Sequence, residues 1–121
     1  MADFTREELE AIVHKLEGKD LRGLDLSNVD LSGANLLRAD LSNTDLTGAE
    51  LHRANFLGAN LTNACLTDAN ISWAVLEEAN LCGADLCGAN LFSSYLRRSE
   101  YSSETKWPTG FDPVSARALL V

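Results

Sequence analysis

The chain has 121 residues and a mass of 13.1 kDa, which is the size of one domain with a single core. Its net charge is −8 and its pI is near 4.6, which disfavours direct binding to nucleic acid or to an anionic membrane, because both are polyanions. No run approaches the roughly 18 apolar residues of a membrane span, and the acidic start MADFTREELE is unlike a secretory signal, so we expect a cytoplasmic protein.

The first element that the sequence predicts is a capping helix over residues 6–17. Thr5 and Glu8 form a capping box, and Phe4 and Leu9 are placed for a hydrophobic staple. Four apolar residues then share one helical face: Leu9, Ile12, Val13 and Leu16. We expect this face to cover the first turn of the structure that follows.

A repeat of five residues occupies residues 21–100. Its sixteen units read LRGLD LSNVD LSGAN LLRAD LSNTD LTGAE LHRAN FLGAN LTNAC LTDAN ISWAV LEEAN LCGAD LCGAN LFSSY LRRSE. The first residue is Leu in fourteen units, with Phe56 and Ile71 as the exceptions, and the residue two before it is Ala in eleven. A period of five fits neither helix nor strand, so each unit is a short extended piece followed by a turn. Four such units close a square coil with the Leu and the small residue inside, which predicts an all-β solenoid of about four coils.

The residue two after each inner Leu predicts the turns. On the first two sides of the coil it is Gly, Asn or Asp in all eight units, whereas on the other two sides only Gly33 and Gly58 belong to this set. The third position of a type II turn has a positive φ, which Gly and Asn tolerate. We therefore expect type II corners on two sides and a different corner on the others.

The repeat ends before residues 101–121, where Trp107, Phe111 and the following apolar residues suit a plug. Asp112 followed by Pro113 is a good helix start. Because both open ends of the coil are then covered, we expect a monomer. The chain thus divides into an N-terminal capping helix, a repeat region and a C-terminal cap: residues 1–20, 21–100 and 101–121.

These units resemble the pentapeptide-repeat family, whose signature is A(D/N)LXX. The resemblance implies a right-handed quadrilateral β-helix, in agreement with the square coil. The tail TKWPTGFDP is similar to those of cyanobacterial and plastid members of the family, which implies a photosynthetic lineage but no activity.

Enzymatic chemistry is not expected, because no constellation of residues supports it. His14 lies on the capping helix and His52 on the coil surface, and we find no Ser or Cys partner for either in the repeat geometry. The three cysteines are expected to be thiols without a role as metal ligands: Cys65, Cys82 and Cys87. No cofactor and no metal site are predicted.

The acidic residues are uneven along the chain. Residues 1–50 hold 11 acidic and 5 basic groups, whereas residues 51–121 hold 7 and 5. A solvated face is the ordinary explanation. The alternative is a surface that imitates DNA, since the family that the chain resembles includes gyrase-protecting members of that kind. The length argues against it, because one duplex turn takes about 34 Å and four coils give about 20 Å.

Residues 71–80, ISWAVLEEAN, place large apolar side chains where the repeat elsewhere has polar ones. Stacking residues twenty apart gathers such side chains near the corner between the third and fourth sides, in the last two coils. With two nearby arginines they form the candidate protein-binding patch: Trp73, Val75, Phe92, Tyr95, Arg53 and Arg97.

Two explanations of this corner stay open. The C-terminal tail could fold back and cover it, or it is a protein-binding face, since exposed aromatics with flanking Arg are typical of interface anchors. The sequence predicts a non-enzymatic rigid scaffold or protein–protein interaction module whose protein partner and pathway are unknown. The alternative is a DNA-mimicking modulator of a type II topoisomerase (gyrase).

Overall fold

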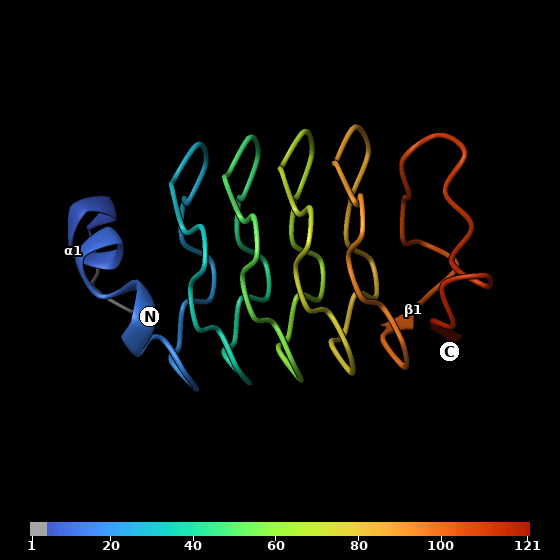
Figure 1. Ribbon diagram of the computed structural model, residues 1–121, viewed down its shortest axis with the longest axis horizontal. Coiled ribbons are helices and arrows are strands. Elements are labelled where there is room, and N and C mark those ends of the chain that lie inside the picture. Colours follow the sequence, from blue (N-terminus) through green and yellow to red (C-terminus); the bar gives the residue numbers. More distant parts are fainter. Residues whose placement is uncertain (1–4) are drawn as a thin grey trace.

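The computed structural model describes residues 5–121, so that Phe4 of the expected hydrophobic staple lies outside the described residues. Its elements in chain order are a helix, a 3-10 helix and two short strands: α1 (Arg6–Ala11), η1 (Val13–Lys15), β1 (Glu100–Tyr101) and β2 (Leu119–Leu120). Between η1 and β1 the chain winds into coils stacked along the long axis, with α1 at one end and β1 at the other (Figure 1). No helix in residues 5–121 is long and apolar enough to cross a bilayer.

Each coil takes twenty residues and has four sides. Parallel backbone bridges join residues twenty positions apart, such as Asp20 with Asp40 and Asn35 with Asn55. We number the sides by the residues of their first coil: side one (20–24), side two (25–29), side three (30–34) and side four (35–39), each recurring every twenty residues. The square coil expected from the five-residue period is therefore confirmed.

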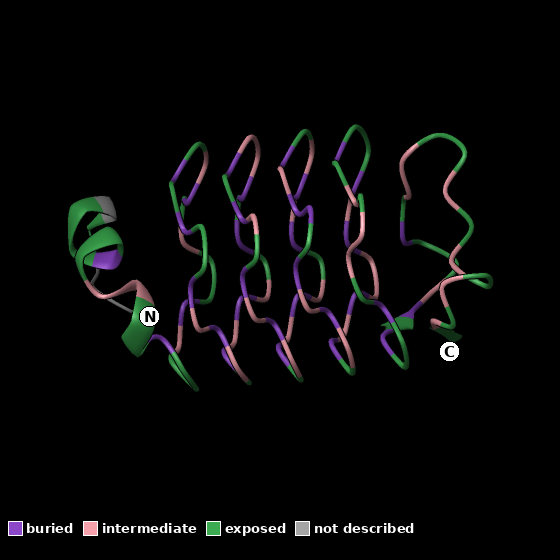
Figure 2. Cartoon of the chain, viewed as in Figure 1, coloured by how far each residue is buried: buried purple, intermediate pink, exposed green. Residues whose placement is uncertain are grey.

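The inner positions form a continuous apolar core along the axis, and Figure 2 shows buried residues recurring in each coil. Leu51 and Ala54 are both fully buried, and the same alternation of a large and a small residue recurs in the coils above and below. Thr44 replaces Ala at one inner position, and its hydroxyl donates to the carbonyl of Leu41 at 2.7 Å. Such a bond satisfies the buried hydroxyl without interrupting the core.

All sixteen corners have the same backbone, so the prediction of a second corner type on sides three and four is wrong. The third residue of each corner has a φ between 56° and 73°, and the N–H of the fourth residue donates to the carbonyl of the first at 2.9–3.4 Å. This is the type II pattern. In the first three coils the N–H of the corner residue also donates to the next coil, as Arg53 does to Ser72 at 3.0 Å. Stacking therefore fixes the corner, whatever side chain stands there.

The Asp or Asn that precedes the inner Leu supports the corner that follows. In twelve of the sixteen units its side-chain oxygen accepts the N–H of the residue two positions later, as Asn60 does from Thr62 at 3.0 Å. This is the local bond that favours Asx residues in turns. Val75 and Tyr95 stand at the same position without such an oxygen, so their side chains serve no corner bond.

The N-terminal helix begins as expected but is shorter than the predicted 6–17. The capping box is confirmed, since Glu8 N–H donates to the Thr5 hydroxyl at 3.1 Å and Thr5 N–H donates to the Glu8 carboxylate at 3.2 Å. α1 ends at Ala11 because the carbonyl of Val13 already accepts the N–H of Asn35 in the first coil, at 2.9 Å. Two residues of the expected apolar face are fully buried: Leu9 and Leu16.

Coil geometry begins one unit before residue 21. Lys19 N–H donates to the carbonyl of Leu16 at 3.1 Å, and Gly18 has a φ of 66°, which together make a further corner. The segment after η1 therefore belongs to the solenoid and not to the cap.

The C-terminal segment forms an irregular fifth coil and no helix. Residues 113–117 form successive turns, although the Asp112 carboxylate accepts the Val114 N–H at 3.0 Å as a helix cap would. β1 and β2 pair in parallel, with Glu100 opposite Leu119, so the chain returns to side one after one further circuit. The helix expected from Asp112 and Pro113 is therefore wrong, because the backbone pairs with the coil below instead.

Aromatic residues of this segment pack against one another and against the core. Trp107 stacks on Phe111 with ring centroids 5.1 Å apart, and its ring meets Tyr101 edge-on at 5.5 Å. Both Trp107 and Phe111 pack against the core cluster. The Trp107 Nε1 is buried without a hydrogen-bond partner among the described residues.

Candidate functional site

Trp73 is the centre of the candidate site, and its backbone conformation is unusual for a large residue. It occupies the third position of its corner with a φ of 61°, and its side chain is 42% exposed. A left-handed conformation costs an L-residue other than Gly about 1–2 kcal/mol. The corner therefore holds a large aromatic ring on the surface at a position where Gly would be less strained.

Residues of three successive coils meet at this ring. Phe92, from the coil after Trp73, packs edge-on with ring centroids 6.1 Å apart, and it is itself 67% exposed. Arg53, from the coil before, holds its guanidinium carbon 5.8 Å from the Trp73 ring centroid. That distance is within the range of a cation–π interaction. The three side chains form one ladder on the outer surface.

A chain of side-chain hydrogen bonds holds Arg53 in place. Its Nε–H donates to His52 Nε2 at 3.2 Å, and His52 Nδ1 lies 2.9 Å from the hydroxyl of Ser72. Because an arginine nitrogen is always a donor, His52 Nε2 accepts and its Nδ1 carries the proton. The Ser72 hydroxyl then donates to Asn70 at 2.6 Å, and Asn70 donates to Glu50 at 3.1 Å. Every bond in this chain has a defined direction.

The expectation that His52 has no Ser partner is thus wrong. The sequence held the signal, because His52 and Ser72 are twenty residues apart at the same position of side three. This pair does not have the arrangement of a nucleophile and its base, since the His52 proton points at the hydroxyl and Ser72 is 7% exposed. The pair positions Arg53 instead.

The other three predicted patch residues lie on the adjoining side. Val75 and Tyr95 stand in one column of side four, joined by a parallel bridge, and Tyr95 is 51% exposed. Arg97 is exposed two residues further along the same side. No direct contact links these three to the Trp73 ring among the described interactions. The structure thus brings Arg53, Trp73 and Phe92 together and places the others beside them.

The C-terminal tail does not cover this corner. Trp107 and Phe111 pack over the end of the coil, whereas Trp73, Phe92 and Tyr95 keep large exposed fractions of 42%, 67% and 51%. The apolar surface therefore stays open to solvent, and internal packing against the tail is no explanation for it.

The charge of the solenoid is unequal around its axis. In the four regular coils side two carries four carboxylates and no basic residue: Asp25, Asp45, Asp68 and Asp85. Lys106 of the fifth circuit pairs with Asp85 at the end of this side. Side four, which bears Tyr95, carries three arginines against two glutamates: Arg38, Arg97, Arg98, Glu77 and Glu78. A partner that approaches the aromatic corner therefore meets the least acidic side of an acidic protein.

The cysteines and the residue types that bind metals are the other candidates for chemistry in the described chain. Residues 5–121 contain no group of three or more His, Cys, Asp or Glu placed to hold a metal ion. Burial would raise the pKa of the Cys65 thiol, but hydrogen bonds with Thr47 and Thr67 lower it overall. The pKa of Cys82 is raised, chiefly by burial. All three cysteines are free thiols.

Five-residue units stacked into four-sided coils define a class of solenoid proteins, and comparison with known proteins agrees. The family model described as pentapeptide repeats matches eight copies, over residues 15–40, 34–72 and 69–99. The chain belongs to the pentapeptide-repeat family. A comparison with curated proteins finds no match.

Three solved structures show the likeness. Rfr23 from the cyanobacterium Cyanothece 51142 is 40% identical with a TM-score of 0.53, and the match covers 73% of this chain and 63% of that one. A pentapeptide repeat protein of the Arabidopsis thaliana thylakoid lumen is 35% identical, with a TM-score of 0.44 and coverages of 73% and 61%. QnrB1, a plasmid-mediated fluoroquinolone resistance protein, is 19% identical with a TM-score of 0.68 and coverages of 88% and 62%.

The family match and the likeness to Rfr23 imply a right-handed quadrilateral β-helix, and Rfr23 comes from a cyanobacterium, one of the two lineages that the sequence resemblance indicated. The chain spans less than two thirds of the length of each of the three solved structures. The cytoplasmic location stays a prediction.

Proposed function

We propose that this protein is a non-enzymatic, rigid interaction module, and that its aromatic corner binds a protein partner. The aromatic corner comprises the six residues predicted from the sequence: Arg53, Trp73, Val75, Phe92, Tyr95 and Arg97. We expect the protein to act as a monomer, without direct binding to nucleic acid or to a membrane.

The observation that carries the proposal is the exposed Trp73 ring on a left-handed backbone, with a φ of 61°. Folding alone favours Gly at this corner, because Gly avoids the left-handed penalty of about 1–2 kcal/mol. Strain of this kind is typical of functional sites, where the surrounding structure holds a side chain that function requires. The bond from His52 to Arg53 supports the same interpretation, since it orders an exposed side chain.

The composition of the corner also fits an interface. Trp, Tyr and Arg are the residues that most often dominate binding energy, and Trp73, Tyr95 and Arg53 are all present. The stacked coils hold them on a backbone that is hydrogen-bonded to neighbouring coils, so little order is lost when a partner binds.

The test is to remove the ring without straining the corner. Trp73→Gly removes the side chain and relieves the left-handed backbone, and Glu78→Gly does the same at an exposed corner one side further on. We expect both variants to unfold at or above the wild-type temperature. Quantitative affinity capture from the native cell extract, followed by mass spectrometry, should lose its specific protein with Trp73→Gly and keep it with Glu78→Gly. Capture that is equal with both variants would contradict the proposal.

Modulation of a gyrase by imitation of DNA is the second candidate, and the four carboxylates of side two favour it. The structural likeness to QnrB1, a fluoroquinolone resistance protein, supports the fold only, at 19% identity. A supercoiling assay separates the candidates. An effect at micromolar protein that disappears on changing Asp25, Asp45 and Asp85 together to Asn would favour the gyrase alternative, and no effect would remove it.

A further inference from the structure

The regular coils show which backbone groups pair on side three. Between the third and fourth coils, the Asn90 N–H donates to the carbonyl of Ala69 at 2.9 Å. The N–H groups of Ile71 and Trp73 donate upward to the carbonyls of Asn90 and Phe92, each at 2.9 Å. Each circuit therefore holds the next one here through the carbonyl of the last residue of side two and through two N–H groups of side three.

The fourth coil leaves the same three groups without partners. They are the carbonyl of Ala89 and the N–H groups of Leu91 and Ser93, and none of them has a hydrogen bond within residues 5–121. Unpaired strand edges of this kind are templates for another strand.

The fifth circuit pairs on either side of this gap. On side two the N–H of Leu86 donates to the carbonyl of Lys106 at 2.7 Å, and on side four the N–H of Arg98 donates to the carbonyl of Arg117 at 3.0 Å. Between these bonds the chain reads WPTGFDPVSA, in which two prolines lack an N–H. The tail leaves the edge at side three and returns to it at side four.

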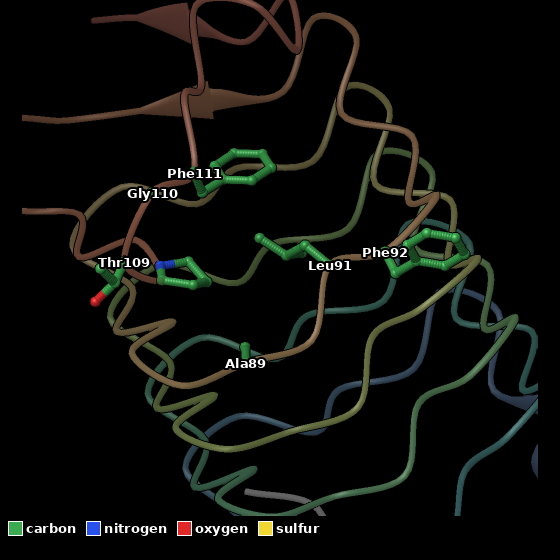
Figure 3. A pocket seen from close by; sticks show the side chains of 7 residues that line it. Ala89, Leu91, Phe92, Thr109, Gly110 and Phe111 are labelled. Carbon is green, nitrogen blue, oxygen red and sulfur yellow. The ribbon is translucent and has the colours of Figure 1, made fainter.

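A cleft of about 290 Å³ lies between the open edge and the tail. Its floor is formed by Ala89, Leu91 and Phe92, and its far wall includes Pro108 and Phe111. Figure 3 shows Leu91 and Phe111 facing this space, with Phe92 at its outer side. Leu91 is only half-buried here, whereas the equivalent inner residue of an earlier coil, Leu51, is fully buried. The cleft therefore exposes part of the core together with the unpaired backbone.

We propose that this open edge binds an extended segment of a partner protein by parallel strand addition, replacing the missing rung of side three. All bridges of the solenoid are parallel, so the segment runs from side three towards side four. The inner positions of a rung take a small residue and, two positions later, an aliphatic one, which fixes the Ala-X-Leu character of the segment.

Charge complementarity defines the far end of the segment. Arg97 and Arg98 are exposed where the gap closes, and Arg117 lies beside them through its backbone bond to Arg98. None of the three forms an ion pair within the described chain. The segment therefore ends in acidic residues, and it is an acidic-apolar peptide of the pattern Ala-X-Leu followed by Glu or Asp.

This surface goes beyond the proposed function, although Phe92 belongs to both. The aromatic corner presents side chains outward, whereas the open edge presents backbone along the solenoid axis. Trp73→Gly removes the first and leaves the second intact, so failure of one proposal is distinguishable from failure of the other.

The probe is a synthetic peptide with the sequence of residues 69–78, which occupies this register in the third coil, carrying Gly in place of Trp73. It has the inner Ala and Ile, and it ends in Glu77 and Glu78. We expect saturable binding by fluorescence polarisation. In 15N NMR spectra the amides of Leu91 and Ser93 should exchange with solvent in the free protein and become protected on binding. A peptide N-methylated at the position of Asn70, which cannot donate to Ala89, should bind at least tenfold more weakly.

Matched variants test the cleft. Phe92→Ser should weaken the peptide about tenfold, since it removes apolar floor, whereas Val114→Ser changes an equally exposed apolar residue of the tail outside the cleft. Replacing both glutamates of the peptide with Gln should weaken binding and remove its dependence on salt.

Three outcomes would overturn the proposal. They are equal binding of the N-methylated peptide, protection of the Leu91 and Ser93 amides in the free monomer, and protection that rises with protein concentration alongside a dimer in sedimentation analysis. The last would assign the edge to a second copy of this chain.

Discussion

Substituting Ala for Gly at two corners can separate the free-energy cost of a left-handed backbone from the cost of a side-chain clash. Gly33 and Gly48 both have positive φ, at 70° and 67°. A Cβ added to Gly33 would meet nothing within 4 Å, whereas one added to Gly48 would meet the side-chain amide of Asn28, from the coil below. Changing each to Ala therefore imposes the same backbone strain and differs in one contact.

The expected magnitudes follow from these surroundings. Ala in a left-handed conformation destabilises the folded state by about 1–2 kcal/mol. The change also lowers the conformational entropy of the unfolded chain, which offsets about 0.4–1 kcal/mol of that cost. Gly33→Ala should therefore destabilise by about 1 kcal/mol. Gly48→Ala must also displace the Asn28 amide, the flexible end of a side chain, and the low end of overpacking costs adds about 1 kcal/mol. The two variants should lower Tm by about 4 °C and 8 °C.

Urea unfolding followed by circular dichroism measures both variants. As a control, Gly48→Ala is repeated in an Asn28→Gly background, where the contact is absent and the cost should return to that of Gly33→Ala. Equal costs for the two single variants, within about 0.3 kcal/mol, would refute the assignment of the Asn28 contact.

Three further predictions use the same fold. Glu78→Gly relieves an exposed left-handed corner and should raise the free energy of unfolding by about 0.5–1 kcal/mol in urea. Leu51→Ala opens a cavity in a fully buried position and should lower it by about 2–5 kcal/mol. Hydrogen bonds from the Arg22 side chain and backbone lower the pKa of Asp20 from 3.8 to about 2. The stabilisation is thus present above pH 3.8 and lost as the pH falls towards 2, so acid unfolding should be less steep for Asp20→Asn.

The core of this fold could be predicted because one physical requirement repeats without interruption. Leu or a close substitute every fifth residue, with a small residue two before it, admits only a narrow coil, and the bridges between residues twenty apart confirm it. The C-terminal circuit has no such period. Asp85 pairs with Lys106, so one extra residue enters before the bridge and the register by twenties is lost. The open edge at Leu91 and Ser93 depends on that irregularity, which the five-residue period could not predict.

The corners were mispredicted for a different reason. Residue preference at a turn is a local effect of about 1–2 kcal/mol, whereas every corner N–H of the first three coils is bound to the next coil, as Glu78 is to Arg97 at 3.3 Å. Giving one side a different turn would break that bond in each of these coils. The stacked corner residues of one side therefore share one backbone conformation. Trp73 adopts a φ of 61°, although a large side chain disfavours it.

The two halves of the solenoid differ in how well the corner residue suits the corner backbone. On sides one and two all eight corner residues are Gly, Asn or Asp, so sequence and backbone agree and the corners stabilise the coil. On sides three and four, six corners hold other residues in the same conformation: Arg38, Arg53, Trp73, Glu78, Ser93 and Arg98. The backbone is the same on all four sides, so Gly would stabilise each of these corners more than the side chain that stands there. Replacing the five outside the Trp73 position with Gly should raise stability, and any of the five whose removal also weakens a bound partner belongs to the binding surface. Arg53, held over Trp73 by His52, is the first to test.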